Sequence, residues 1–425
     1  MNAPRPLMSL EEALAQLLAA GTREQIRQTE TVSSFEALGR VLAEDVASAL
    51  DVPPADNSSM DGYALRLADV PAAGAVLRVG QRIPAGHVGR ALEPGTAARI
   101  FTGAQVPPGA DAIVMQELST ALDDGQVRID TLPLPGQWIR RRGEDIRDGS
   151  TVLTRGTRLT PQALGLAAAV GRASLAVLRR PRVALFSTGD ELVMPGQPLK
   201  PGAIYNSNRY TLRGLLQAAG CEVQDLGIVP DRLDATRAAL RAAAGHNDLI
   251  VTSGGVSVGE EDHLRPAMAA EGRVDLWQLS MKPGKPLAFG ALPRQAATAG
   301  AGTGEAAVSA GEALFIGLPG NPVSSWVTGL LAVLPLLRAL QGMPATQPRA
   351  LSVRADFDWP RPDKRREFLR ARFNAEGGLE LFANQSSGVL TSAHWADGLI
   401  DNAGGQAIVR GDAVRFLPLA DLTSA

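Results

Sequence analysis

The chain has 425 residues, too long for one ordinary hydrophobic core, and at roughly 100–200 residues per domain this length predicts two to four domains. Hydrophobic residues make up 45% and charged residues 20%, the composition of a soluble globular protein. With 42 Lys and Arg against 44 Asp and Glu, the net charge of −2 excludes a general attraction to nucleic acid or to anionic membranes, so any anion site has to be local.

A single cysteine and four scattered histidines limit the metal chemistry. Cys221 alone forms neither an intrachain disulfide nor a multi-cysteine metal site, which fits a reducing compartment, and zinc is disfavoured. The first residues have an amphipathic helical pattern rather than that of a signal peptide. The most apolar later stretch, 326–337, is about twelve residues long, against the ~20 that span a bilayer. We therefore expect a cytoplasmic protein with no membrane or nucleic-acid partner.

The first 50 residues have the apolar spacing of a helix. Residues 7–49 place Leu10, Leu14 and Leu17 on one face, with a break expected at Gly21. At 51–61 paired prolines and a cluster of Asn, Ser and Asp predict a sharp turn of the chain.

From Tyr63 to about residue 153 the pattern changes to short apolar runs interrupted by Gly and Pro, which predicts a small all-β module. Residues 160–178 return to a helical pattern, with Thr160 as the expected N-cap before Pro161. We therefore expect a β domain over 51–149, inserted into a split helical segment made of 7–50 and 150–180.

Between residues 181 and 342, buried strands alternate with amphipathic helices. Such alternation predicts a mostly parallel sheet with helices on both faces, and ligands of these sheets bind beyond the carboxyl ends of the strands. Residues 343–425 are again strand-like and predict a separate C-terminal β domain. The expected fold class is therefore α/β and multidomain.

The stretch "LIVTSGGVSVGEEDHL", residues 249–264, combines a glycine turn with acids. Ser253, Gly254 and Gly255 allow backbone amides to approach a ligand, and a helix starting soon afterwards adds an anion site. The alternative is a sharp turn followed by a solvated, acidic first helical turn. Acids beside a bound phosphate repel it unless a metal ion or a cationic group lies between them, and this conflict favours a metal-assisted site.

Polar residues also follow the neighbouring strands. Asp190 and Glu191 come directly after one strand, and Asp231 follows the next, where it is either a ligand or a helix N-cap. Lys282 and Lys285 in "MKPGKP" suit an oxyanion, unless that loop is merely solvated. "GLPGNP" holds Asn321 in a rigid turn that is either structural or shaped to bring backbone close to a ligand.

Eight motifs together resemble one family. "NSSMDGYAL", "RIFTGAQVPPGAD", "RRRGEDIRDGS", "FSTGDEL", "YNSN", "TSGGVSVGEEDH", "KPGKP" and "GLPGNPVSS" are similar, in the same order, to those of the molybdopterin molybdenumtransferases and of the C-terminal domain of the scaffold protein gephyrin. These enzymes insert molybdenum at the last step of molybdenum cofactor synthesis. The resemblance covers roughly residues 7–410 and, as a set, is highly specific.

The resemblance implies a homodimer whose protomer has a split helical segment, an inserted β domain, an α/β pterin-binding domain and a C-terminal β barrel. It implies that adenylylated molybdopterin and molybdate are the substrates, that Mg²⁺ is the cofactor, and that AMP and molybdenum cofactor are released. Molybdopterin adenylyltransferase and molybdoenzyme maturation factors become candidate partners.

The motifs also imply site residues. The catalytic set would be Asp61, Thr102 and Asp145, from an inserted domain that faces the other protomer in family dimers, with Glu191, Asp231 and Asp262, which would also hold the metal. Substrates would be bound by Asp190, Ser253, Gly254, Gly255, Asn321, Lys282 and Lys285, and from the C-terminal domain by Ser386 or Ser387 and by Arg366, with the adjacent Arg365 as the alternative.

Three rival functions are weaker. Molybdopterin adenylyltransferase is a single domain resembling residues 181–341 and needs neither the inserted nor the C-terminal domain. A gephyrin-like scaffold would be expected to carry a long disordered linker or an assembly domain. A bifunctional protein would need a second fused enzyme, for which 425 residues leave no space.

Overall fold

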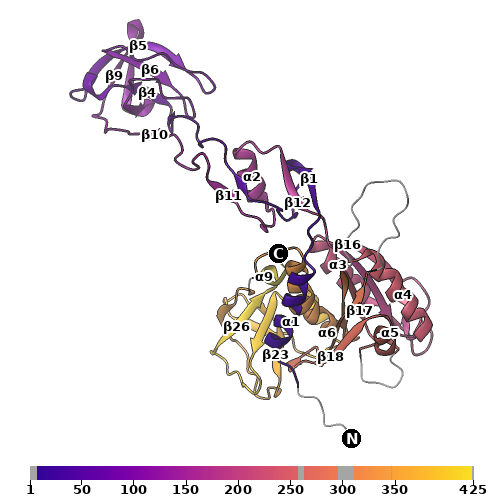
Figure 1. The fold of residues 1–425 in the computed structure, drawn as a ribbon. Helices are drawn as coiled ribbons and strands as arrows, with labels where there is room; N and C mark the ends of the chain where they lie inside the picture. The colour runs from indigo at the N-terminus through magenta and orange to yellow at the C-terminus, as the bar shows by residue number, and fades with distance from the viewer. Residues whose placement is uncertain (1–6, 257–262, 295–310, 346, 424–425) are drawn as a thin grey trace, which may run out of the picture.

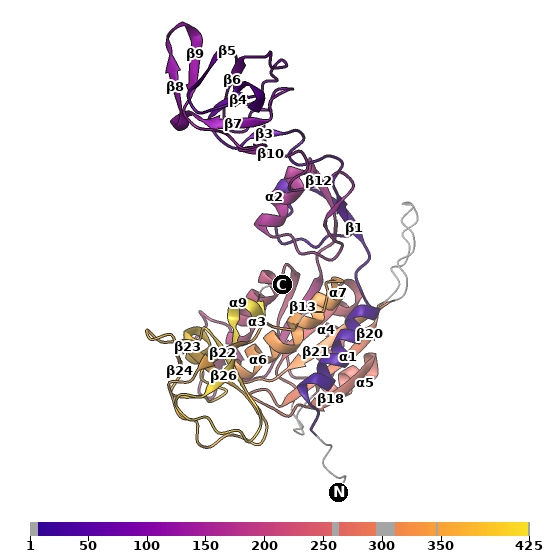
Figure 2. The same ribbon diagram turned by 90° about the vertical axis from the view of Figure 1, so that its left-hand side faces the viewer.

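The structure is a computed structural model that describes residues 7–256, 263–294, 311–345 and 347–423. It is elongated: an α/β domain and a C-terminal barrel pack together at one end, and an arm leads through a middle module to a β domain at the far end (Figures 1 and 2). The inserted β domain is therefore well separated from the α/β domain and the barrel of its own chain.

The α/β domain is built on a six-stranded sheet in the order β16-β13-β17-β21-β20-β18. Four strands are parallel, as expected: β13 (Arg182–Thr188), β16 (Glu222–Val229), β17 (Leu249–Ser253) and β21 (Glu312–Leu318). Two more, β18 (Arg273–Gln278) and β20 (Pro286–Pro293), are antiparallel and were not apparent from the alternation, because antiparallel neighbours need no crossover helix between them.

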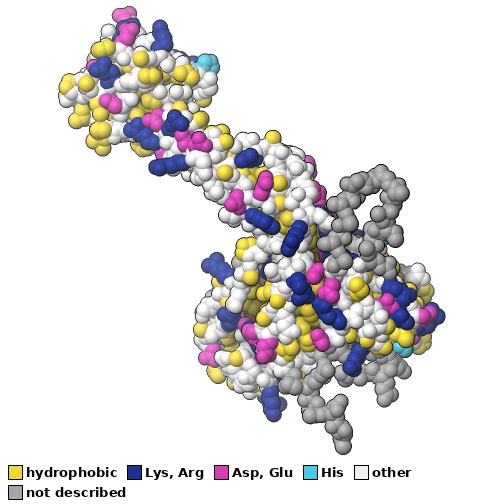
Figure 3. All heavy atoms as spheres, in the orientation of Figure 1, with side chains coloured by type: hydrophobic (Ala, Val, Ile, Leu, Met, Phe, Trp, Pro, Cys, Tyr) yellow, Lys and Arg dark blue, Asp and Glu magenta, His cyan; other side chains and the backbone are white. Residues whose placement is uncertain are grey.

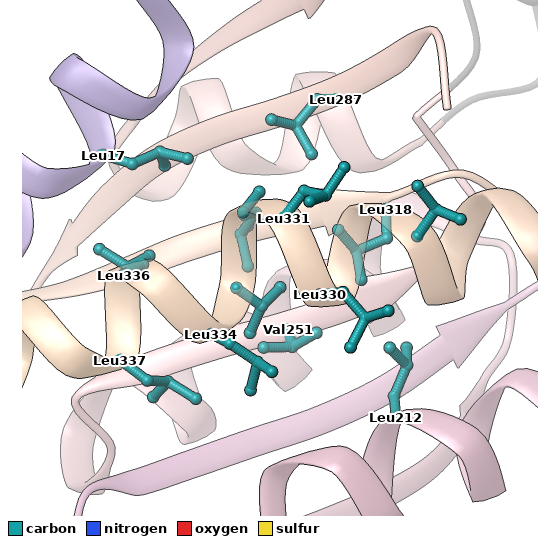
Figure 4. Packing of buried hydrophobic residues seen from close by; sticks show 14 of the residues in the cluster. Leu17, Leu212, Val251, Leu287, Leu318, Leu330, Leu331, Leu334, Leu336 and Leu337 are labelled. Atoms are coloured by element: carbon teal, nitrogen blue, oxygen red, sulfur yellow. The ribbon is translucent and has the colours of Figure 1, made fainter. Parts of the chain in front are cut away.

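Helices cover both faces of this sheet, as predicted. One face packs against α1 (Leu10–Arg23), α3 (Ser207–Ala218), α6 (Pro322–Thr328) and α7 (Leu334–Leu340), and the other against α4 (Leu233–His246) and α5 (Leu264–Glu271). Figure 4 shows leucines of α1, α3 and the α6–α7 helix meeting strand residues such as Val251 and Leu318 in the larger core.

The helix from Pro322 to Leu340 runs through the centre of this core. The π-helical segment η5 (Gly329–Val333) joins α6 to α7 just before Pro335, whose missing N–H and ring disturb the regular hydrogen-bond pattern. By length and hydropathy these 19 residues qualify as a membrane span, but 94% of the apolar window is buried inside the domain. The segment is therefore explained as a core helix.

Helix α1 begins at a capping box between Ser9 and Glu12 and buries Leu10 and Leu17 against α7. The break expected at Gly21 is wrong, because the helix continues to Arg23. A Cβ on Gly21 would lie 2.8 Å from the Cβ of Ala339, so glycine at this position permits the close approach of α7.

Beyond Arg23 the predicted helix is also wrong. Residues 29–47 contain β1 (Thr29–Ser33), the 3₁₀ turn η1 (Ser34–Glu36) and β2 (Val46–Ala47). These strands pair with β12 (Ser174–Leu178) and β11 (Thr151–Leu153), more than a hundred residues away in sequence. Such long-range pairing leaves no local periodic signal.

These pairs and α2 (Pro161–Ala169) form the middle module. Thr160 caps α2 as predicted, its side chain accepting a hydrogen bond from the Ala163 amide at 3.2 Å. The helix ends at Ala169, so only the first half of the helix expected over 160–178 is present.

The inserted domain is all-β, as predicted, with a sheet in the order β7-β4-β6-β5-β9-β8. Its elements are β4 (Gly62–Leu65), η2 (Leu67–Asp69), β5 (Ala75–Ile83), β6 (Thr96–Ile100), β7 (Ala112–Met115), η3 (Gln116–Leu118), β8 (Ser119–Leu122), η4 (Asp123–Gly125) and β9 (Gln126–Ile129).

Where the inserted domain meets the middle module, β3 (Asn57–Ser58) pairs with β10 (Ile139–Arg140). Basic and acidic side chains gather at this junction (Figure 3), including the ion pairs Arg141–Asp56 at 2.7 Å and Arg142–Asp51 at 2.6 Å. The junction is thus held by charge pairs as well as by backbone pairing.

The C-terminal sheet curls into the expected barrel. Its order is β19-β23-β25-β26-β22, with β24 beside β23, and a bridge between Ala355 and Leu379 joins the end of β22 to β24. The elements are β22 (Leu351–Arg354), β23 (Arg366–Phe373), β24 (Leu379–Leu381), α8 (Thr391–Trp395), β25 (Gly398–Asn402), β26 (Ala413–Pro418) and α9 (Leu419–Thr423).

Strand β19 (Met281–Lys282) belongs in sequence to the α/β domain but pairs with β23 of the barrel. This pairing brings the "KPGKP" loop to the boundary between the two domains.

Candidate active site

A cavity of about 720 Å³ lies at the carboxyl ends of β13, β17 and β21, where ligands of such sheets bind, and the barrel closes its other side. We call it the main cavity. Its lining combines strand-end, helix-start and barrel residues: Thr188, Glu191, Leu192, Ile204–Asn208, Ser253, Gly254, Lys282–Pro286, Pro319–Pro322, Ser324, Arg365 and Gln385–Ser387.

The glycine turn forms part of the cavity wall. Gly254 has a φ of +88°, and a Cβ there would lie 2.6 Å from the Thr188 carbonyl oxygen, so no other residue fits without a backbone shift. Ser253 is buried, and its hydroxyl lies 3.0 Å from that of Ser187. Gly255, with a φ of +66°, follows the turn but is not on the lining.

Two buried polar atoms on the lining have no hydrogen-bond partner among the described residues, Thr188 Oγ1 and Asn206 Nδ2. Thr188 is 5% exposed and Asn206 is 2% exposed. The other side-chain atom of Asn206, Oδ1, caps α3 by accepting from the Arg209 amide at 3.2 Å. An unpaired buried donor costs about 1–3 kcal/mol, and a polar ligand in the cavity would satisfy both of these donors.

Two helices begin at the cavity, and helix N-termini attract anions. The residues of α3 on the lining are Ser207 and Asn208, and those of α6 include Pro322 and Ser324. The Asn208 side chain donates through Nδ2 to the Gly320 carbonyl at 2.7 Å, which fixes the two helix starts relative to one another. Asn321 is on the lining, in the N-cap position of α6.

The "KPGKP" loop places both predicted lysines on the lining. Lys282 Nζ lies 3.4 Å from an oxygen of Glu367, which is fully buried, and 3.5 Å from one of Asp363. Lys285 is exposed to the cavity and has no ion pair within the described ranges. An oxyanion can therefore be met directly by Lys285.

Arg365 is the third cation on the lining. It holds Asp363 through two hydrogen bonds of 3.0 and 2.9 Å, and this pairing keeps the pKa of the Asp363 carboxyl well below its usual range. Ser386 and Ser387 face the same end of the cavity from the barrel. The Ser387 carbonyl accepts from the Val323 amide at 2.9 Å, which ties this loop to the first turn of α6.

Arg366, predicted as a substrate ligand, lies elsewhere. It makes two hydrogen bonds to Asp401, of 2.5 and 2.7 Å, and pairs with Glu11 of α1. Arg366 begins β23 and Arg365 is the residue just before it; only Arg365 is on the lining of the main cavity. The structure brings Arg365 there.

The predicted acids are dispersed. Glu191 is on the lining, whereas Asp190 is exposed and off it. Asp231 follows β16 and is also off the lining; Arg232, not Asp231, occupies the N-cap position of α4. Asp262 lies outside the described residues. In the part of the chain that the structure describes, no three His, Cys, Asp or Glu side chains group as metal ligands, so these residues alone do not form the predicted Mg²⁺ site.

Two of the inserted-domain residues do meet each other. The backbone amide and the hydroxyl of Thr102 both donate to Asp61 Oδ1 at 2.8 Å, and these bonds lower the pKa of Asp61. Asp145 is exposed in the loop between β10 and β11. None of the three is on the lining of the main cavity. Strands β4 and β6, beside Asp61 and Thr102, lie at the far end of the arm (Figures 1 and 2), whereas Asp145 is next to Ile146 of the middle-module core.

Several lining residues were not assigned a role from the sequence, notably Thr188, Asn206, Asn208 and Gln385. Asn206 and Asn208 lie in "YNSN", one of the motifs of the resemblance, so a signal was present for them. The signal that distinguishes Thr188 and Asn206 is an unpaired buried donor, which only the folded chain displays.

Comparison with known proteins identifies the family. Residues 8–171 match the MoeA N-terminal region (domain I and II), residues 184–339 a probable molybdopterin binding domain, and residues 352–419 the MoeA C-terminal region (domain IV). The molybdopterin molybdenumtransferase of Haemophilus influenzae is 39% identical over 381 residues, 88% of this chain and 89% of that protein. The chain belongs to the molybdopterin molybdenumtransferase family.

Other members agree with this assignment. The molybdopterin molybdenumtransferase of a Nostoc species is 38% identical, covering 84% of this chain and 80% of that protein. A crystal structure of the molybdopterin biosynthesis moeA protein from Pyrococcus horikoshii OT3 matches with a TM-score of 0.79 at 28% identity, over 97% of this chain and 100% of that one. The family fold therefore extends over the whole described chain, including the arm.

Proposed function

We propose that this enzyme inserts molybdenum from molybdate into adenylylated molybdopterin, cleaving the phosphoanhydride and releasing AMP and molybdenum cofactor. The observation that carries the proposal is the composition of the main cavity. One side offers unpaired donors and two helix N-termini, and the other offers Lys282, Lys285 and Arg365 with two serines.

The strand-end side and the barrel side of the main cavity suit two different anionic reactants. On the strand-end side, Thr188, Asn206 and the amides around Gly254 would bind polar groups of the pterin or its phosphates. On the barrel side, the cations and the serine hydroxyls would hold molybdate, a dianion. Fixed positive groups in a partly closed site lower the repulsion between the two reactants more than mobile counter-ions in water do.

The proposal includes Mg²⁺, with Glu191 as the described carboxylate that faces the cavity and Asp262 as its expected companion. When bound, Mg²⁺ neutralises phosphate oxygens and stabilises the leaving phosphate. The described residues alone do not form a group of metal ligands. The experiment below therefore tests the metal requirement separately from the reaction.

We also propose that the enzyme is a cytoplasmic homodimer. Strands β4 and β6, beside Asp61 and Thr102 in sequence, lie at the far end of the arm (Figures 1 and 2), so a second copy would have to bring these residues to the main cavity. A cytoplasmic location is consistent with the single cysteine.

The test gives purified protein adenylylated molybdopterin with and without molybdate and Mg²⁺, and measures AMP and molybdenum cofactor. We expect AMP release that depends on molybdate and is abolished by a chelator. Absence of molybdate-dependent AMP release would overturn the proposed reaction, whereas release that persists in the chelator would overturn only the metal requirement.

A further inference from the structure

A buried arginine lies behind the barrel side of the main cavity. Arg370 of β23 is 1% exposed and is among the largest fully buried side chains. No carboxylate pairs with it in the described part of the chain, although other buried charges do have such partners: Asp248 has Arg179 and Glu367 has Lys282. Burial lowers the pKa of Arg370 to about 10, which still leaves the guanidinium charged at neutral pH.

All the hydrogen bonds of this guanidinium go to uncharged oxygens. Nη2 donates to the Ser386 carbonyl at 3.4 Å, Nη1 to the Phe368 carbonyl at 3.2 Å and Nε to the Ser392 hydroxyl at 3.2 Å. Ser386 is a cavity-lining residue, so Arg370 lies directly behind the wall that would meet molybdate.

The backbone of Arg370 holds the same loop. Its amide donates to Gln385 Oε1 at 2.9 Å, and its carbonyl accepts from Gln385 Nε2, also at 2.9 Å. Gln385 and Ser386 are adjacent on the lining. One residue therefore anchors the serine loop through its backbone and through its charged side chain.

The charged side chains on the barrel side of the cavity indicate what the positive charge of Arg370 contributes. Lys282 and Arg365 face the acids Asp363 and Glu367, which neutralise much of their charge. On the barrel side of the main cavity, four cations, counting Lys285 and Arg370, face these two acids, whereas the lining acid Glu191 follows β13 on the strand-end side. The net charge of this group is +2, equal and opposite to that of a tetrahedral dianion. Without Arg370 the net charge would be +1.

We propose that Arg370 is a positioning residue for the oxyanion: it holds the Ser386–Ser387 loop in place and supplies an unneutralised positive charge to that end of the cavity. The inference rests on the proposed function, because it takes molybdate as the ligand there. It assigns Arg370 no direct contact with a substrate.

The experiment titrates molybdate alone into wild-type protein, Arg370→Met and Arg370→Lys by calorimetry, with melting curves to verify folding. Because Arg370 lies one residue behind the cavity wall, loss of its charge should weaken binding of a dianion by about tenfold or more in Arg370→Met. Arg370→Lys keeps the charge and should stay within about threefold of wild type. Arg370→Gln replaces the Met variant if that protein does not fold.

Two controls separate charge from structure. Arg372→Met removes the same charge from the same strand at an exposed position off the cavity, and should leave molybdate affinity unchanged. Ser392→Ala removes one hydrogen bond of Arg370 but keeps its charge, and should weaken binding by less than about threefold.

The outcomes are distinguishable. A folded Arg370→Met protein that binds molybdate as wild type does would overturn the inference and leave the proposed function intact. A Lys variant as weak as the Met variant would overturn the role of the charge. Wild-type protein that does not bind molybdate would overturn the proposed oxyanion site together with this inference.

Discussion

The main cavity and the inserted domain both carry residues that the sequence assigns to one site, yet they differ physically. In the cavity, Thr188 and Asn206 are buried and have donors that no described residue satisfies. In the inserted domain, Asp61 is partly exposed and already bonded twice by Thr102. The cavity thus offers unsatisfied donors to a ligand within one chain, whereas the Asp61–Thr102 pair is locally satisfied, and its predicted role in the same site depends on the proposed homodimer.

The largest effect should distinguish two adjacent arginines. Arg365→Ala removes a cavity cation and should lower molybdate-dependent turnover by roughly a hundredfold, as expected for loss of a charged hydrogen-bonding ligand. Arg366→Ala removes a side chain bonded to Asp401 and Glu11, and turnover should stay within about threefold. Steady-state AMP release checks both variants, and the reverse order would mean that the cavity has been assigned the wrong arginine.

A buried ion pair lies where the arm joins the α/β domain. Asp248 is 2% exposed and pairs with Arg179, in the link between β12 and β13, and with Arg294. Replacement by Asn leaves two cations without their shared acid and should cost about 3 kcal/mol of unfolding free energy, measured in urea. An unchanged midpoint in urea would show that this pair does not stabilise the joint.

The Asp248 carboxylate should also make the free energy of unfolding depend on pH. Burial opposes ionisation of Asp248, but its hydrogen bonds and the charge of Arg179 outweigh burial and lower its pKa. A depressed folded pKa gives stability that is present above the unfolded pKa of about 3.9 and is lost as the pH falls through the folded value. Wild type should therefore lose stability below about pH 4 more steeply than Asp248→Asn does.

Mixing two inactive variants tests whether the arm serves another chain. Asp61→Ala damages the arm and Lys282→Ala damages the cavity, so a mixed dimer retains one complete site if the two come from different protomers. Random reassociation of equal amounts should restore about a quarter of wild-type AMP release, since half of the dimers are mixed and each has one working site. No recovery in reassociated dimers would place both residues in the site of one chain.

The smallest expected effect on stability and binding comes from removing the unpaired hydroxyl of Thr188. Thr188→Val removes a buried hydroxyl that has no partner among the described residues, so the ligand-free protein should gain up to about 1 kcal/mol or stay unchanged. Pterin substrate should bind about tenfold more weakly, because the ligand loses its partner. Melting curves and substrate titration measure the two effects, and a destabilised variant with unchanged binding would contradict the role of Thr188.

Much of the architecture could be predicted from local patterns. The β/α alternation of residues 181–342, the inserted all-β domain and the Thr160 cap depend on residues close in sequence, and the structure shows all three. The sequence pattern predicts helix for β1, β2 and β12, because their pairing partners are far away in the chain, whereas β11 falls within the predicted all-β pattern that runs to about residue 153. Gly21 was read as a break because its contact with Ala339 is a tertiary one.

For the site, the sequence predicted several residues that line the main cavity: the Ser253–Gly254 turn, Lys282, Lys285 and Asn321 from loops of the α/β domain, and the serine pair from the family resemblance. Only the tertiary structure decided between Arg365 and Arg366, because the pairing of Arg366, the first residue of β23, with β19 fixes where the two adjacent side chains lie. It also revealed Thr188, Asn206 and Arg370, whose importance lies in burial and missing partners. Burial of a side chain depends on the whole fold, and no short stretch of sequence predicts it.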